Sequence, residues 1–173
     1  MRIVAGEFRG RRLKSPTWDG LRPTSDRLRE TLFNILGDAI RGARVLDGYA
    51  GTGAIGIEAL SRGAARVTFV EHDRRAIALI ESNLAPLARR RDAIIRTGFG
   101  GLGLASFDVI VLDPPYAPEA AAEALDQAAG LLAPGGRLVV EHAARHAPPA
   151  ERGTLRLQRT VKAGDSALAF YGF

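Results

Sequence analysis

The chain has 173 residues, a length that suits one domain with a full hydrophobic core. It has no cysteine, which excludes disulfides and thiolate zinc sites, and no apolar run long enough for a signal peptide or a membrane span. We therefore expect a cytoplasmic protein with no membrane contact and no metal. The net charge is +5, and residues 1–30 hold eight basic against four acidic residues. This basic end predicts contact with a polyanion, the alternative being an arginine-rich, merely solvated segment.

Residues 2–14 predict a basic β-hairpin, because short apolar pieces are separated by glycines. A loop over 16–23 follows. Thr24 or Ser25 can then cap a helix whose apolar residues recur at i, i+4, i+7 and i+8 and which Gly37 can end.

From residue 43 strands and helices alternate. The predicted strands are 44–47, 66–71, 93–97, 107–113 and 137–142, and the predicted helices are 53–62, 73–87 and 118–132. A turn over 134–136 precedes the fifth strand, and residues 154–162 and 166–173 predict a closing antiparallel hairpin. The pattern indicates an α/β, Rossmann-like, doubly wound and mostly parallel seven-stranded sheet with that hairpin at its C-terminal end. The basic β-hairpin and first helix form a small N-terminal extension.

The segment from Asp47 to Gly56, Asp-Gly-Tyr-Ala-Gly-Thr-Gly-Ala-Ile-Gly, is the clearest cofactor signal. Its last three glycines are spaced G-x-G-x-x-G, and Glu71 follows Gly51 by twenty residues, so the dinucleotide fingerprint is formally satisfied. Such a match is ambiguous between a nicotinamide cofactor and S-adenosylmethionine.

Two details favour S-adenosylmethionine. Four residues separate the apolar strand from Gly51, whereas in dinucleotide enzymes the first glycine follows the strand directly. Asp47 would repel a pyrophosphate but can hold the cationic amino-acid part of S-adenosylmethionine, and Glu71 can accept the ribose hydroxyls. The alternative makes Asp47 a helix cap and Glu71 a solvated strand end. The residues expected at the cofactor from this reasoning are Asp47, Gly48, Tyr49, Ala50, Gly51, Thr52, Gly53, Glu71 and His72.

The tetrapeptide Asp113-Pro114-Pro115-Tyr116 ends the fourth predicted strand, at the edge where doubly wound sheets bind ligands. The exocyclic amine of a base is weakly nucleophilic and needs acceptors that pull on its N–H bonds. Asp113 supplies a carboxylate, Pro114 a stiffly held carbonyl, and Tyr116 an aromatic face for stacking. We therefore expect Asp113, Pro114, Pro115 and Tyr116 to be the catalytic residues of an amino-methyltransferase, the alternative being a strand end that caps the next helix.

Asp113 also favours a particular base. Guanine presents N1–H and N2–H as adjacent donors that one carboxylate can accept, whereas adenine presents a donor beside an acceptor and suits an asparagine amide better. The hypothesis is transfer to guanine N2.

The whole chain resembles the RsmD family of ribosomal RNA guanine-N2 methyltransferases. The resemblance rests on residues 2–13, 21–36, 46–63, 69–71 and 113–116, and on the tail 164–171. It implies methylation of a guanine in 16S ribosomal RNA, on a 30S subunit or assembly intermediate, by a monomer that uses S-adenosylmethionine. It also implies that residues 1–40 form an RNA-binding extension of a methyltransferase domain, 41–173. The RNA-binding residues expected there are Arg2, Arg9, Arg11, Arg12, Lys14, Arg22, Thr24 and Arg27.

Two positions depart from the family pattern. Where relatives place an acid after the third strand, this chain has Gly98 and Phe99, so we expect the backbone there to contact the cofactor adenine. Ala163 stands where a tyrosine usually precedes the glycine of the tail. Three rival functions remain: a DNA adenine or cytosine amino-methyltransferase, a non-catalytic RNA-binding assembly factor, and a nicotinamide oxidoreductase. The chain has no spare length for a DNA target-recognition domain, and its crevice offers no acid or base for hydride chemistry.

Overall fold

The computed structural model describes residues 1–18, 25–104, 106–117 and 119–173, which form two compact units, Met1–Gly98 and Phe99–Phe173. Each unit is built around its own group of adjacent strands. No helix in the described ranges is both long and apolar enough to cross a bilayer.

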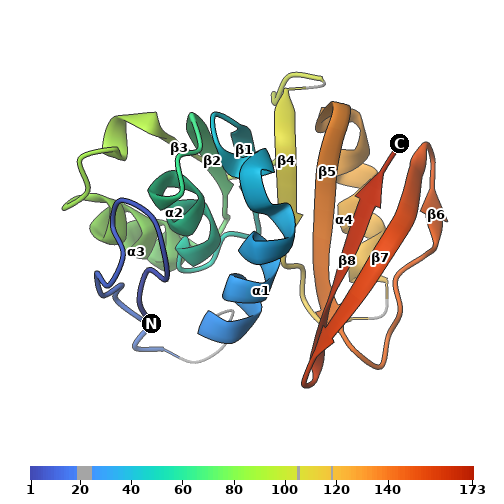
Figure 1. Cartoon of the computed structure of the whole chain (residues 1–173), viewed down its shortest axis with the longest axis horizontal. Coiled ribbons are helices and arrows are strands. Elements are labelled where there is room, and N and C mark those ends of the chain that lie inside the picture. The colour runs from blue at the N-terminus through green and yellow to red at the C-terminus, as the bar shows by residue number, and fades with distance from the viewer. Residues whose placement is uncertain (19–24, 105, 118) are drawn as a thin grey trace. The chain divides into compact units, whose positions relative to one another are not determined.

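The first unit contains three parallel strands in the order β3-β2-β1. They are β1 (Arg44–Gly48), β2 (Arg66–Val70) and β3 (Ala93–Arg96), which pair in parallel register. The buried apolar residues of β1 and β2 match the expectation for strands covered on both faces. Figure 1 shows α2 and α3 beside these strands.

The helices of the first unit follow the predicted pattern with shorter ends. They are α1 (Asp26–Leu36), the 3-10 turn η1 (Gly37–Ile40), α2 (Ala54–Ser61), α3 (Arg74–Leu84) and η2 (Arg90–Asp92). Ser25 caps α1 by accepting from Leu28 N at 3.1 Å, and Gly37 ends it, as predicted. The α3 helix ends three residues before the predicted end because Pro86 lacks the N–H that would continue the ladder.

The predicted N-terminal hairpin is reduced to one antiparallel bridge between Arg2 and Arg12. Ile3 N donates to Arg11 O and Gly10 N donates to Ile3 O, both at 2.9 Å, so the segment folds back on itself without forming regular strands. The predicted loop over 16–23 and the alternative cap Thr24 lie partly or wholly outside the described residues.

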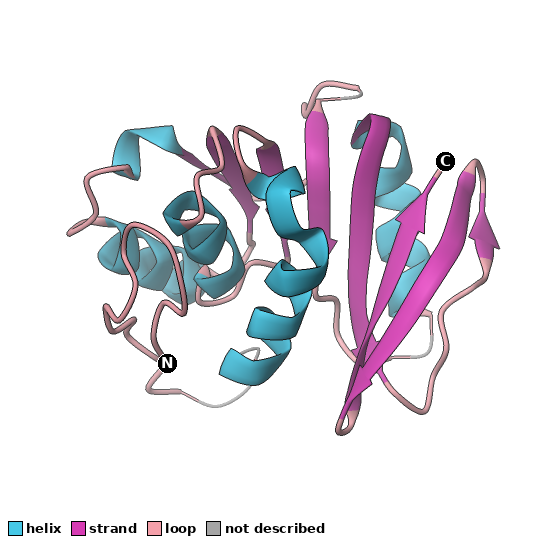
Figure 2. Ribbon diagram, viewed as in Figure 1, coloured by secondary structure: helices cyan, strands magenta, loops and turns pink. Residues whose placement is uncertain are grey.

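The second unit places its strands in the order β4-β5-β8-β7-β6. They are β4 (Phe107–Leu112), β5 (Leu132–Ala143), β6 (Glu151–Arg152), β7 (Leu155–Ala163) and β8 (Ser166–Gly172). The β4 and β5 strands are parallel, and the other neighbours are antiparallel. Helix α4 (Ala120–Ala128), followed by η3 (Ala129–Leu131), packs on β5 and lies behind the strands in Figure 2.

Two details of the second unit differ from the prediction. The expected turn over 134–136 lies inside β5, where the register jumps: Phe107 pairs with Leu132, but Val109 pairs with Arg137. The pairs on either side are two residues apart in β4 and five apart in β5, so the Pro-Gly-Gly sequence forms a bulge of three extra residues within β5, with Gly135 at φ 75°. The β6 strand was missed because two residues are too few to show an alternating pattern.

Candidate active site

The predicted cofactor loop connects β1 to α2 through a tight, left-handed turn. Tyr49 has φ 62°, which places it in the region that a side chain rarely adopts, and Gly51 and Gly53 have φ 54° and 75°. Ala50 N donates to Val70 O at 3.0 Å, and Gly53 N donates to Ala50 O at 2.7 Å. The loop is therefore held in a fixed shape by its own backbone and by β2.

Gly56 explains why the third glycine of the fingerprint is present. A Cβ at this position would lie 2.3 Å from Cε1 of Phe69 in β2. The absence of a side chain lets α2 approach the strand closely, which fixes the direction in which the N-terminus of the helix points.

Asp47 lies at the end of β1 and is 1 % exposed. Its Oδ2 accepts a hydrogen bond from Gly56 N at 2.8 Å, so it caps the first turn of α2, where Gly53 as N-cap residue has no side chain to do so. The alternative interpretation of Asp47, as a residue that caps the following helix, therefore matches the contact that its carboxyl group makes. Burial raises the pKa of Asp47 to about 8, since desolvation outweighs the hydrogen bond from Gly56, and the nearby Glu71 adds to the increase.

Glu71 follows β2 and is also buried, which rules out the solvated alternative. Its Oε2 accepts from Gly51 N at 2.8 Å, and its Oε1 accepts from His72 N at 2.7 Å and Asp73 N at 2.9 Å. A carboxylate has about four acceptor positions, so three backbone donors fix its orientation and leave room for about one further donor. The Glu71 carboxylate thereby links the cofactor loop to the start of α3, and the direction of its remaining acceptor position is fixed.

The other predicted cofactor residues are placed as follows. Thr52 is buried, and its carbonyl accepts from Asn83 Nδ2 at 3.1 Å. The side chain of His72 is 88 % exposed, with Nδ1 3.6 Å from Glu71 Oε1. Gly98 ends the first unit and Phe99 begins the second, and each is half-buried. The loop, Glu71 and His72 are brought together within the first unit.

The chemistry of these donors and acceptors fits S-adenosylmethionine. A fixed carboxylate after β2 suits a ribose hydroxyl. Asp47 was predicted to hold the cationic amino-acid group, but its burial and raised pKa leave it largely protonated at neutral pH, so its role in the structure is to cap α2 beneath the loop. The left-handed turn exposes backbone to close approach by a ligand.

The tetrapeptide Asp113 to Tyr116 directly follows β4 in the second unit. Pro114 is buried, whereas Asp113 and Tyr116 are half-buried and Pro115 is exposed. The Tyr116 hydroxyl donates to Glu141 Oε1 at 2.8 Å and lies 2.7 Å from Ser166 Oγ. The ring is therefore fixed at its hydroxyl end from two strands, β5 and β8.

The surroundings of Tyr116 keep it protonated. Its pKa is raised to about 12, chiefly by burial, with further contributions from the nearby carboxylates of Glu141 and Asp113. The phenol therefore remains a hydrogen-bond donor to Glu141 across the neutral range.

The sequence analysis missed Glu141 and Ser166 as partners of Tyr116. A signal was present for Glu141, since it directly follows the apolar run Leu138 to Val140 in the predicted strand, and an acid is costly to bury there without a partner. Ser166 lies in the tail that the family resemblance rests on, but its contact with Tyr116 depends on pairing between β5 and β8, which no local pattern reveals.

The predicted RNA-binding residues of the N-terminal segment lie at its surface. Arg2, Arg9 and Arg12 are exposed, as is Arg27 on α1. Arg11 and Lys14 are exposed as well but already have partners, because Arg11 Nη1 donates to Pro86 O at 3.0 Å and Lys14 Nζ donates to Ser82 Oγ at 2.6 Å. Arg22 and Thr24 lie outside the described residues.

Glu58 of α2 anchors the N-terminal segment and was also missed. It is fully buried, and its carboxylate accepts from Val4 N at 2.8 Å and from Ala5 N at 2.9 Å. Arg62 Nε donates to the same carboxylate at 2.8 Å, and Arg29 Nε lies 3.6 Å away. One side chain thereby joins the extension, α1 and α2.

Comparison with known proteins agrees with these features. The family described as conserved hypothetical protein 95 matches residues 1–172. Ribosomal RNA small subunit methyltransferase D of Escherichia coli strain K12 is 36% identical over 176 residues, which cover 99% of this chain and 89% of that protein. The solved structure of Escherichia coli yhhF has 37% identity and a TM-score of 0.85, over 99% of this chain and 96% of the other. A Thermus hypothetical protein, TTHA0928, has 31% identity and a TM-score of 0.79, over 98% of both chains.

These matches confirm the predicted α/β fold class, the enzyme class and the dependence on S-adenosylmethionine. They extend over both units and include the N-terminal segment. The chain belongs to the RsmD family of methyltransferases.

Proposed function

We propose that this protein transfers a methyl group from S-adenosylmethionine to the N2 amine of a guanine in small-subunit ribosomal RNA. The observation that carries the proposal is the aspartate-led tetrapeptide after β4, with its tyrosine held from two strands. The name of the Escherichia coli relative, a ribosomal RNA small subunit methyltransferase, supports the choice of polymer.

The proposed roles follow from the chemistry of each group. Glu71 accepts from the cofactor ribose, Asp47 fixes the shape of the loop by capping α2, and the backbone of Gly98 and Phe99 contacts the adenine. When bound, the cofactor supplies the activated methyl group, so the protein needs no nucleophile of its own. Asp113 accepts hydrogen bonds from guanine N1–H and N2–H and takes up the N2 proton that is released when the methyl group bonds to N2. The Pro114 carbonyl accepts a hydrogen bond from the second N2–H, and Tyr116 stacks on the base. Catalysis then consists of orientation and fixed acceptors.

The surroundings of the reaction are part of the same proposal. The protein acts as a monomer in the cytoplasm, on a 30S subunit or assembly intermediate. The exposed arginines of the N-terminal segment and α1 contact the RNA backbone, for which a planar guanidinium is well suited. Residues 1–40 thereby serve as the RNA-binding extension.

The decisive experiment supplies labelled S-adenosylmethionine and 30S particles from a strain that lacks the enzyme, and then maps the labelled base. Label on guanine N2 of the small-subunit RNA is expected. Naked ribosomal RNA and duplex DNA are tested in parallel. Label on DNA adenine or cytosine would establish the rival enzyme, and no transfer to any of the three would favour a non-catalytic assembly factor.

A further inference from the structure

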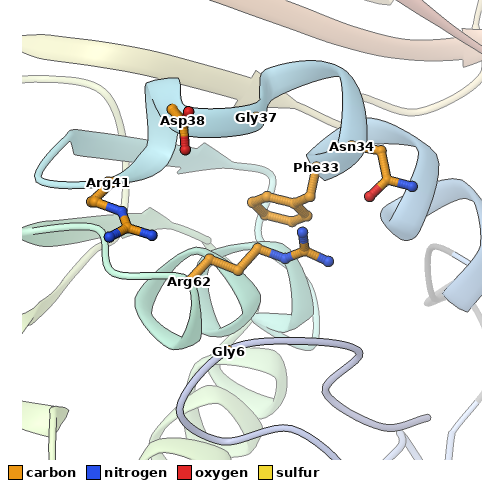
Figure 3. A pocket seen from close by; sticks show the side chains of 7 residues that line it. All are labelled: Gly6, Phe33, Asn34, Gly37, Asp38, Arg41 and Arg62. Carbon is orange, nitrogen blue, oxygen red and sulfur yellow. The ribbon is translucent and has the colours of Figure 1, made fainter.

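A hollow of about 360 Å³ opens on the first unit, where the turn at Gly6, helix α1 with η1, and the end of α2 meet. Figure 3 shows its lining: the Arg62 side chain extends from the end of α2 toward Phe33 and Asn34 of α1, and Arg41 lies at the other end, near Asp38 of η1. The volume falls in the range of small-ligand sites. We call it the arginine hollow.

Arg62 is held in place before any ligand arrives. Its guanidinium carbon lies 4.9 Å from the centre of the Phe33 ring, and its Nε donates to buried Glu58 at 2.8 Å. The side chain is 19 % exposed. Its two Nη groups make no hydrogen bond to the described part of the chain. A guanidinium fixed in this way loses little entropy when it binds an anion.

Arg41 supplies a second cation at the rim. It is exposed just after η1, and its side chain forms no ion pair with the described residues. Asn34 on α1 adds an exposed amide that can donate to an oxygen. Asp38 lines the same hollow and opposes an anion, and Glu58 offsets part of the Arg62 charge, so Arg41 supplies the positive charge that has no ion pair within the described residues.

The arginine hollow is separate from the cofactor loop, although both adjoin α2. The loop meets the N-terminus of the helix, and Arg62 is the residue that follows its last turn. Eight residues at 1.5 Å each put the two ends about 12 Å apart. The hollow therefore takes a ligand group other than the reacting methyl donor.

Charge favours a polyanion over a protein carboxylate. The first unit carries 18 basic against 11 acidic residues, and the second carries six against eight, so the net charges are +7 and −2. One wall of the hollow is the turn of the basic N-terminal segment, which Glu7 N ties to α2 by donating to Ser61 O at 2.7 Å. Guanidinium groups in a hollow that is walled by the basic N-terminal segment suit the phosphate groups of an RNA backbone.

We infer that the arginine hollow binds a phosphodiester group of the RNA substrate, outside the transfer site, and thereby fixes the register of the RNA on the first unit. The inference rests on the proposed RNA substrate. Arg62 and the Asn34 amide contact the phosphate oxygens, and Arg41 attracts the RNA backbone at the other end of the hollow.

The test compares three variants with the wild-type chain in two assays. Arg41→Glu reverses a rim charge without breaking a described contact, Asp38→Asn removes the opposing carboxylate, and Arg159→Glu makes the same charge reversal on exposed β7 as a control. The first assay measures binding of in vitro transcribed small-subunit ribosomal RNA over a salt series. The second measures KM and kcat for methyl transfer to 30S particles.

Arg41→Glu should weaken RNA binding about tenfold and lower the slope of log K against log salt by about 0.7–0.9, the value for one phosphate contact. It should raise KM and leave kcat and calorimetric binding of S-adenosylmethionine unchanged. Asp38→Asn should tighten RNA binding about twofold to threefold, and Arg159→Glu should change it much less than Arg41→Glu does.

Several outcomes would overturn the inference: equal effects of Arg41→Glu and Arg159→Glu, wild-type RNA affinity in Arg41→Glu, or a wild-type chain that binds no RNA. Normal RNA binding with a raised KM only on 30S particles would assign the hollow to a ribosomal protein and also contradict it. A wild-type chain that binds the RNA but transfers no methyl group would contradict the proposed function alone, because the binding assay would still compare the variants.

Discussion

Two residues of the tetrapeptide, Asp113 and Tyr116, differ in their surroundings and in the roles proposed for them. Asp113 directly follows β4 and is partly exposed, whereas Tyr116 is tied to Glu141 and Ser166 at its hydroxyl. The difference separates a proposed contact with the amine from a proposed contact with the base ring. Each can be tested by a change that leaves the size of the side chain almost unaltered.

Asp113→Asn should lower kcat for methyl transfer to guanine about 100-fold, since loss of one fixed charge partner in an active site costs about this much. The amide cannot accept from both N1–H and N2–H of guanine as the carboxylate can. Transfer is measured with labelled S-adenosylmethionine and 30S particles, and calorimetry of cofactor binding should be unchanged. Full activity on guanine in this variant would contradict the proposed role.

Tyr116→Phe keeps the ring but removes the hydroxyl that Glu141 and Ser166 hold. We expect a loss of about 1–2 kcal/mol in the free energy of unfolding and a several-fold lower kcat, because the ring is no longer fixed. Tyr116→Ala removes the stacking surface as well and should raise KM about tenfold or more.

Tyr171→Phe is the matched control for this pair. The Tyr171 hydroxyl donates to Pro149 O at 2.7 Å, so the variant loses a similar hydrogen bond away from the tetrapeptide. It should lose stability in urea unfolding but keep kcat. Equal kinetic losses in Tyr116→Phe and Tyr171→Phe would show that the effect is general destabilisation.

Asp47 predicts an unusual dependence of stability on pH. Its pKa is raised from 3.8 to about 8 by burial, so the folded state retains a proton that the unfolded state loses. This contribution is fully present below about pH 4 and declines as pH rises toward 8. In urea unfolding, the free energy of unfolding should fall more between pH 5 and pH 8.5 in the wild type than in Asp47→Asn. A free energy of unfolding that rises with pH in the wild type relative to Asp47→Asn would contradict this prediction.

At the scale of elements, the N-terminal segment and α2 depend on each other. The segment is irregular, so its backbone N–H groups rely on side chains of α2, namely Glu58 and Ser61. Gly6 makes the approach possible, since it has φ +82° and a Cβ there would lie 1.8 Å from Ser61 O. The basic segment is thus part of the first unit and not a free arm.

Glu58→Gln tests this dependence. The change removes the buried negative charge that Arg29 and Arg62 share, leaving Arg29 only its pair with Asp26, and sets an amide against the N–H groups of Val4 and Ala5. We expect the free energy of unfolding to fall by about 3 kcal/mol or more, as for other buried pairs that lose one partner. Glu30→Gln, at an exposed position of α1, is the control and should change the free energy of unfolding by less than about 0.5 kcal/mol. Wild-type stability in Glu58→Gln would contradict the anchoring role.

At the scale of the whole molecule, charge and chemistry are distributed unequally between the two units. The first unit holds the cofactor loop and a net charge of +7, and the second holds the tetrapeptide and a net charge of −2. Under the proposed function, the unit that binds the cofactor also supplies the cations for the RNA backbone, while the unit that presents acceptors to the guanine is slightly acidic.

The sequence predicted the repeating elements well, because each is marked locally. The stripe of α1, its Ser25 cap and the apolar runs of β1, β2 and β4 required no knowledge of neighbours. The ends of α3 and α4 were less accurate, since 3-10 turns and proline shorten them. The turn predicted at 134–136 before the fifth strand is instead a bulge inside β5, because the strand already begins at Leu132 and continues on the other side.

The sequence by itself determined the fold class, the cofactor loop, the tetrapeptide and the family, since these depend on residue types at fixed local spacing. Tertiary structure alone revealed the partners: Asp47 as the cap of α2, Glu141 and Ser166 around Tyr116, Glu58 beneath the N-terminal segment, and the arginine hollow. The contacts of Tyr116 with Glu141 and Ser166, and of Glu58 with Val4, join residues at least 25 apart in the chain. Which buried polar groups meet is decided by how helices and strands pack, because a buried donor or acceptor must find its partner wherever the fold brings one.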